Sequence, residues 1–225
     1  DIYDVFDFLQ FTYKRPRYRT LLVSPHSTRP GLMHLVEQEI ANARAGYRAE
    51  MTLKCNNLVD NQLVMKLYEA SDAGVKIRLI IRGMCSLLPG VRGISENIEA
   101  ISIVDRFLEH PRAYVFYNRG NPRYLLGSAD LMTRNLDYRV EVLCPIRDRA
   151  AQRVLQDILD QQWHDNVKAR IIDQHQVNEY VPRRAKAAMI RSQESIHRYL
   201  SSGKLPRYPK TPAAVSKPQR RRKRH

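Results

Sequence analysis

The chain has 225 residues, of which 43% are hydrophobic and 27% are charged, and this composition excludes a mainly disordered protein. Its length predicts one domain of generous size, or one and a half. It holds no run of 18 apolar residues, so we expect no transmembrane helix, and its start does not read as a secretory signal. Cys55, Cys85 and Cys144 are too few and too widely spaced for a disulfide framework or a four-cysteine zinc site, which favours a reducing cytoplasm.

The charge indicates what kind of partner the chain binds. The formal net charge is +15, and residues 204–225 contribute nine Lys and Arg residues and no acidic residue. The rest of the sequence is still basic. A basic protein attracts anions such as nucleic acid, polyphosphate, nucleotide or acidic lipid, and charge alone does not choose among them.

In chain order, the first predicted elements are a helix, a strand and a second helix. The sequence after Asp1 reads as a helix already under way, which predicts that the chain is a piece of a longer protein. Residues 20–25 form a short apolar run that ends in proline, which is typical of a strand. Apolar residues then recur at helical spacing over residues 32–43, and Gly46 marks the expected end of that helix.

Residues 50–82 predict a right-handed βαβ unit with parallel strands. The first strand covers residues 50–56, and Asn57 then looks like the N-cap of a helix that ends before Gly74. The second strand, residues 75–81, is the strongest in the sequence because it is apolar and rich in β-branched residues.

The second half of the chain is predicted to be richer in strands. A loop over residues 83–97 precedes them, a long amphipathic helix surrounds residues 154–162, and a weaker strand follows at residues 167–172. Helical character returns in residues 184–200, and the proline-rich basic segment after Ser201 is expected to be disordered. The fold class is therefore α/β, with a mixed sheet flanked by helices. The other expected strands are residues 98–104, 113–117, 124–127 and 138–143.

Polar residues at strand ends are candidates for chemistry, because ligands of open α/β sheets bind beyond the carboxyl ends of the strands. Arg82 directly follows the strand at residues 75–81, where a guanidinium can meet an anion; the alternative is a solvated strand end. His110 lies just before the strand at residues 113–117, and an imidazole can transfer protons near neutral pH because its reference pKa is about 6.5.

Further polar residues lie within 26 positions of His110. Two arginines could fork onto phosphate oxygens, a serine and an asparagine could hydrogen-bond the same oxygens, and an aspartate could orient an imidazole. The alternative is that each side chain only caps a strand or a turn, which is a weaker explanation for a group than for one residue. These residues are Arg112, Ser128, Asp130, Arg134 and Asn135.

One short pattern resembles the HxK…GSxN half-motif of the phospholipase D superfamily. It consists of His110 and Arg112, with Arg in place of Lys, followed by GSAD at residues 127–130. Enzymes of that superfamily combine two such halves, in which one His is the nucleophile and the other a general acid/base. His26 and His34 lie in no similar setting, so the resemblance implies that this chain alone is inactive.

Longer segments resemble the C-terminal phospholipase D-like domain of class-one bacterial polyphosphate kinases. They are LKCNNLVD, LYEASDAGVKIRLIIRGMCSLLPG, ISENIEAISIVDRFLEHPR, SADLMTRNLDYRVEVLCP and DNVKARIIDQHQVNEYVPRR. The resemblance implies that residues 1–14 end a preceding phospholipase D-like domain and that residues 15–184 form the C-terminal one. After that domain, the sequence pattern predicts a helical extension over residues 185–203 and the composition predicts a disordered basic tail over residues 204–225, to which the resemblance assigns no role.

Enzymes of that family transfer the γ-phosphoryl group of ATP reversibly to polyphosphate through a phosphohistidine, which the resemblance assigns to a missing upstream domain. It implies that Arg82 and His110 bind ATP or ADP and that His110 is also the catalytic acid/base. Mg²⁺ would be bound mainly by the upstream domain, with no metal site in this chain. A polyphosphate path is predicted from charge and spacing alone, and its residues are Arg112, Asp130, Arg134 and Asn135.

The resemblance further implies partners, which are ATP, polyphosphate, the upstream domains and other copies of the full-length enzyme. It implies a cytoplasmic location, and the basic tail could bind RNA or an anionic membrane surface non-specifically. Two alternatives remain open. One is a phospholipase D-like phosphodiesterase or nuclease that obtains its second half elsewhere; the other is a non-catalytic nucleic-acid-binding module, suggested by the terminal RRRKRH.

Overall fold

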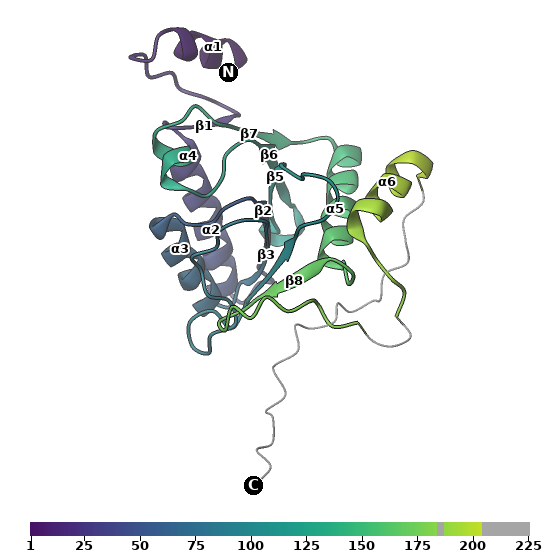
Figure 1. The fold of residues 1–225 in the computed structure, drawn as a ribbon. Helices are drawn as coiled ribbons and strands as arrows, with labels where there is room; N and C mark the ends of the chain where they lie inside the picture. Colours follow the sequence, from purple (N-terminus) through teal and green to yellow (C-terminus); the bar gives the residue numbers. More distant parts are fainter. Residues whose placement is uncertain (184–186, 204–225) are drawn as a thin grey trace.

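The computed structural model describes residues 1–183 and 187–203, shown as a ribbon in Figure 1. The predicted disordered tail, residues 204–225, lies outside the described residues. No helix in the described part of the chain combines the length and the apolar character needed to cross a membrane.

One eight-stranded mixed sheet runs through the molecule, in the order β1-β7-β6-β5-β2-β3-β4-β8. Neighbours β2, β3 and β4 are parallel, and every other neighbouring pair is antiparallel. This confirms the predicted α/β class, and the parallel pairing of β2 with β3 across a helix confirms the βαβ unit. The strands are β1 Leu22–Val23, β2 Glu50–Cys55, β3 Lys76–Ile81, β4 Ile98–Ile103, β5 Arg112–Phe116, β6 Arg123–Gly127, β7 Val142–Ile146 and β8 Ala169–Ile172.

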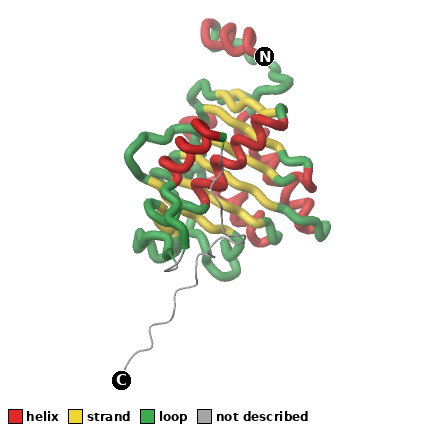
Figure 2. The backbone as a smooth tube through the Cα atoms, turned by 90° about the vertical axis from the view of Figure 1, so that its right-hand side faces the viewer, coloured by secondary structure: helices red, strands yellow, loops and turns green. Residues whose placement is uncertain are grey.

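Helices cover both faces of the sheet (Figures 1 and 2). One face packs against α2 (Thr28–Arg44) and α3 (Asn61–Asp72), with the short α4 (Thr133–Asp137) beside α2. The other face carries α5 (Arg149–Trp163) and α6 (Ser192–Ser202), which contact each other. Each face has its own buried apolar cluster, the larger one under α2 and α3 and the smaller one under α5. Both faces are buried, and the apolar runs LII in β3 and AYVF in β5 fit this, whereas β2 (EMTLKC) alternates polar and apolar residues.

The first helix, α1 (Ile2–Gln10), stands apart from the sheet in Figure 1. The Asp1 carboxylate accepts hydrogen bonds from the backbone N–H groups of residues 19–21, and the Phe8 ring meets His26 edge-on at 4.6 Å between centroids. Several apolar side chains of this segment are exposed: Ile2, Tyr3, Phe6, Leu9 and Tyr13.

Two local predictions are wrong. Asn57 is not the N-cap of α3: Asp60 is, because its carboxylate accepts a hydrogen bond from the backbone N–H of Leu63. The strand predicted over residues 138–143 begins only at Val142, since the preceding chain forms α4 and turns back from it. A short 3₁₀ turn, Asn118–Gly120, connects β5 to β6.

Candidate active site

The strand directions bring several predicted residues to one edge of the sheet. Because β2 and β3 are parallel, Asn56 and Arg82 follow them at the same edge. β5 runs antiparallel to β2 and to β6, so its first residue, Arg112, lies at that edge opposite Gly127. The loops beyond these strands continue side by side, and Leu58 forms bridges with both Cys85 and Leu131.

A continuous chain of hydrogen bonds links Arg82 to His110 along this edge. Arg82 Nε donates to Asn56 Oδ1 at 2.8 Å, and the backbone N–H of Asn56 donates to Asp130 Oδ1 at 2.8 Å. Arg112 forks onto the Asp130 carboxylate at 3.0 and 2.9 Å and donates from Nη1 toward His110 Nδ1 at 2.7 Å. The imidazole at 110 and the guanidinium at 82 therefore belong to one hydrogen-bonded unit.

One part of the unit is buried and the other part is accessible to solvent. Arg112 and Asp130 are buried, Arg82 is half-buried, and His110 is exposed. Arg112 Nη1 also donates to the His110 carbonyl at 2.8 Å, so this one side chain fixes both the backbone and the ring of His110. Arg112 Nη2 also lies 3.1 Å from His110 Nε2, so both ring nitrogens face guanidinium donors, and which of them accepts depends on the tautomer of the imidazole.

Arg112 and Asp130 balance each other's charge inside the unit. Burial by itself would raise the pKa of Asp130, but the bond from Arg112 and the backbone N–H groups of Asn56 and Asn57 outweigh it and lower that pKa. Burial would likewise lower the pKa of Arg112, and the bonds to Asp130 reverse the direction. Both groups are ionised. The N–H groups of Arg112 donate to Asp130 and His110 and do not face solvent. The structure thus gives Arg112 and Asp130 the role of holding His110, while their place on a polyphosphate path stays a prediction.

The other predicted residues lie at the same end of the sheet but outside this unit. Asn135 is buried, and its amide donates to Glu141 at 2.6 Å. Ser128 Oγ accepts from the backbone N–H of Val142 at 3.2 Å, so both side chains shape the start of β7. Arg134, on α4, is exposed.

Sequence reasoning missed Asn56 and Asn57. Asn56 joins Arg82 to Asp130, and Asn57 Oδ1 accepts the backbone N–H of Met84 at 2.9 Å. The available signal was position, since both residues directly follow a buried parallel strand. Gly83 lies close beside them: a Cβ there would lie 2.6 Å from Asn57 Oδ1, so a larger residue would displace the Asn57 side chain from its bond to Met84.

The residues of this edge do not fit a magnesium ion. Mg²⁺ prefers carboxylate and water oxygens, but both Asp130 oxygens are occupied by Arg112 and the two asparagines. No group of three or more His, Cys, Asp or Glu residues suited to a metal occurs in residues 1–183 and 187–203.

A family model described as polyphosphate kinase C-terminal domain 2 matches residues 21–193. The chain belongs to this family. Among curated relatives, polyphosphate kinase from Vibrio cholerae is 52% identical over 198 residues, which is 88% of this chain and 28% of the relative. Polyphosphate kinase from Escherichia coli K12 is 50% identical over 203 residues, covering 90% and 29%.

A solved structure agrees with these matches. The crystal structure of polyphosphate kinase from Porphyromonas gingivalis superimposes with a TM-score of 0.86 at 39% sequence identity, over 90% of this chain and 31% of that one. The chain thus spans less than a third of the length of the polyphosphate kinases it matches, so the activity of a whole enzyme is a proposal for it.

Proposed function

We propose that this chain supplies the nucleotide-binding and proton-transferring wall of a polyphosphate kinase active site whose nucleophile belongs to an upstream domain. The observation that carries the proposal is the hydrogen-bonded unit from Arg82 to His110, which presents a cation and an accessible imidazole at one sheet edge. Family membership supports ATP and polyphosphate as the substrates.

In the proposed reaction, a histidine of the upstream domain attacks the γ-phosphorus of ATP. The bond from that phosphorus to the β,γ-bridging oxygen breaks, ADP leaves, and the phosphohistidine then donates its phosphoryl group to the terminal oxygen of a polyphosphate chain. Such transfers depend mainly on positioning and charge stabilisation. The reverse reaction uses the same groups.

Each residue of the unit has a role in this scheme. Arg82 binds phosphate oxygens of ATP, and the His110 imidazole donates a proton toward the bridging oxygen as ADP leaves. General acid–base help of this kind contributes about 10²–10⁴-fold in rate. Arg112 and Asp130 are positioning residues, because they act through His110. Mg²⁺ would be held by the upstream domain, and the roles proposed for Arg82, His110, Arg112 and Asp130 do not involve it.

The remaining expectations fit the same proposal. Arg134, with Asn135 beside it, would lie along the path of the polyphosphate chain, and the full-length enzyme would form homo-oligomers in the cytoplasm. The basic tail would contribute non-specific attraction to polyanions such as RNA or an acidic membrane surface.

Binding of tripolyphosphate to this chain tests the proposal by isothermal titration calorimetry. Arg82→Ala and His110→Ala should each weaken binding about tenfold or more, the range for hydrogen bonds to charged groups. Arg48→Ala is the matched control: Arg48 pairs with Glu50 at the opposite edge of the sheet, so its loss removes the same charge elsewhere. Equal weakening by all three variants would mean that only net charge matters.

Activity is tested by joining the chain to its upstream domains and measuring ATP-dependent polymer formation, with and without His110→Ala. Hydrolysis of bis(p-nitrophenyl) phosphate by the chain alone would instead support a phosphodiesterase. If deleting residues 204–225 abolished all anion binding, the tail would explain the charge, as a nucleic-acid-binding module predicts.

A further inference from the structure

The loop that carries His110 is held by contacts far from it in sequence. Residues 104–111 connect β4 to β5 and contain no helix or strand, and the side chains of Val104, Phe107 and Leu108 are exposed. Arg112 fixes only the last part of this segment. A loop with so few apolar contacts of its own needs other restraints to keep one conformation.

The start of α6 provides two such restraints. The Gln193 side chain forms a reciprocal pair with the backbone of Phe107: its Oε1 accepts from the N–H at 2.8 Å, and its Nε2 donates to the carbonyl at 2.8 Å. Arg191 forks onto the Asp105 carboxylate at 2.8 and 2.7 Å. The Arg191 bonds lower the pKa of Asp105, so the pair stays charged at neutral pH.

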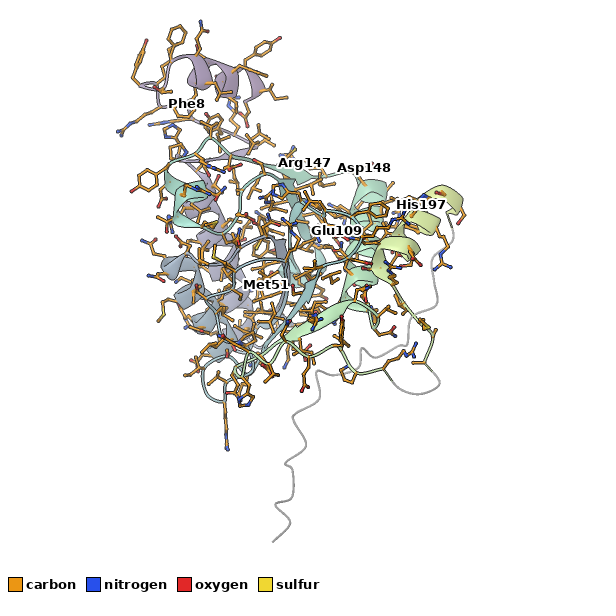
Figure 3. All side chains as sticks on the ribbon, in the orientation of Figure 1. Phe8, Met51, Glu109, Arg147, Asp148 and His197 are labelled. Carbon is orange, nitrogen blue, oxygen red and sulfur yellow. The ribbon has the colours of Figure 1, made fainter. Side chains whose placement is uncertain are left out.

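A third restraint holds the residue next to His110. The Glu109 carboxylate accepts from Lys54 Nζ at 2.8 Å and from the amide of Gln162 on α5. Lys54 is buried in the sheet although it is charged, and Glu109 is its ion-pair partner. Figure 3 labels Glu109 on the side of the sheet that α5 and α6 cover.

The start of α6 is itself firmly placed. The backbone N–H of Ser192 donates to the buried carboxylate of Asp165 at 2.7 Å, and Asn166 exchanges backbone and side-chain bonds with Ile190. Farther along the helix, the Tyr199 hydroxyl donates to Asp157 on α5 at 2.7 Å. The bonds of Asp165 and Asn166 therefore place the start of α6, which carries the two restraints on the loop, whereas the Tyr199 bond holds only the later part of the helix.

We propose that Arg191 and Gln193 are positioning residues for His110, so that the helix following the last strand is part of the active-site framework. This inference rests on the proposed function. Without these restraints the loop samples more conformations, and only a fraction of them puts the His110 imidazole where it can contact a bound phosphate. The apparent affinity for a phosphate ligand falls by that fraction.

Gln193→Ala removes both bonds to Phe107 and should weaken tripolyphosphate binding about three- to tenfold, the size of one or two hydrogen bonds. Gln193→Glu replaces the donor by a carboxylate oxygen that faces the Phe107 carbonyl on a buried side chain, so it should weaken binding at least as much as Gln193→Ala. Arg191→Lys should restore part of the affinity lost in Arg191→Ala. Tyr199→Phe is the control, because it loosens the same helix without touching the loop.

The test combines calorimetry with the NMR signals of the His110 imidazole and with thermal unfolding. We expect broadened or shifted His110 signals in Gln193→Ala and wild-type signals in Tyr199→Phe, at similar unfolding temperatures. Wild-type His110 signals and affinity in Gln193→Ala would overturn the inference. If wild type does not bind tripolyphosphate, or His110→Ala binds as wild type does, the proposed function fails instead, while the NMR comparison still decides whether α6 orders the loop.

Discussion

Two clusters in the described part of the chain use the same forked arginine–aspartate pairing in different surroundings. Arg112 forks onto Asp130 and ends at His110. Arg29 forks onto Asp60 at 2.7 and 2.7 Å and onto Asp137 at 2.8 and 2.6 Å. The second cluster joins α2, the N-cap of α3 and the last residue of α4.

The comparison shows that the role of an arginine–aspartate ion pair depends on which other groups the two side chains contact. The Arg29 cluster fastens three helices on one face of the sheet and contacts none of the predicted site residues. The Arg112 cluster fastens three strand ends and uses its remaining donors on an exposed imidazole. A buried ion pair is thus no sign of a functional site until its other contacts are known.

The largest effect is expected from breaking either cluster. Arg29→Met and Arg112→Met each leave an unpaired buried carboxylate and should lower the free energy of unfolding by about 3–5 kcal/mol. Urea unfolding measures both. Among folded molecules, only Arg112→Met should lose tripolyphosphate binding, and equal binding losses in the two variants would contradict the division of roles.

A double variant separates a loss of tripolyphosphate binding from a loss of stability. In Arg112→Met combined with Asp130→Asn, the new amide oxygen can still accept the backbone N–H of Asn56, and no buried charge is left alone. We expect it to be more stable than Arg112→Met and to bind tripolyphosphate about as weakly as His110→Ala. Wild-type affinity in this variant would show that His110 needs no support from Arg112.

Most of the fold could be predicted from the sequence, because buried strands are apolar runs with turn residues between them. The prediction failed at residues 138–141, where Tyr138, Arg139, Val140 and Glu141 alternate as a strand would. The buried bond from Asn135 to Glu141 holds this stretch in the turn after α4 instead. Tertiary contacts overrode the local pattern.

The site could be predicted only in part. Arg82 and His110 could be proposed from the sequence because each adjoins a clear strand and matches a family pattern. Their connection was not visible, since Asn56 lies 26 positions from Arg82 and 74 from Asp130 in sequence. Gln193 lies 86 positions from Phe107, and nothing in the local sequence around either residue points to the other.

Acid should weaken both clusters over the same pH range. The pKa of Asp130 and of Asp60 is raised by burial but lowered overall by bonds from Arg112 and Arg29. A folded-state pKa below the unfolded value of about 3.9 stabilises the protein above that pH, and this stability is lost as the pH falls through the folded-state pKa.

In urea unfolding below pH 4, Asp130→Asn and Asp60→Asn should each reduce the pH dependence of stability by up to about 1.4 kcal/mol per pH unit. Asp72→Asn, at the exposed end of α3, is the control, because it removes an acid outside both clusters. Unchanged slopes in both cluster variants would mean that other carboxylates govern acid unfolding.

A smaller effect is expected at the link between Arg82 and the Asp130 pair. Asn56→Ala removes the side-chain acceptor of Arg82 and keeps the backbone N–H that Asp130 binds. Stability should fall by about 1 kcal/mol or less, and tripolyphosphate affinity about three- to tenfold, since one hydrogen bond orients the guanidinium. Calorimetry measures the tripolyphosphate affinity. Asn121→Ala, on the loop before β6, is the control for the loss of an amide side chain. Wild-type affinity in Asn56→Ala would show that Arg82 needs no such orientation.

The smallest effect is expected from Arg134. Its side chain is exposed on α4 at the same end of the sheet, so it can meet a polyanion only through solvent-screened attraction. Arg134→Ala should weaken long-chain polyphosphate binding about two- to threefold and reduce the slope of log affinity against log salt by about one, because one fewer counterion is released. Arg48→Ala, at the opposite edge, should leave that slope unchanged. If Arg134→Ala also leaves it unchanged, the polyphosphate chain does not run over α4, and the site extends in another direction from His110.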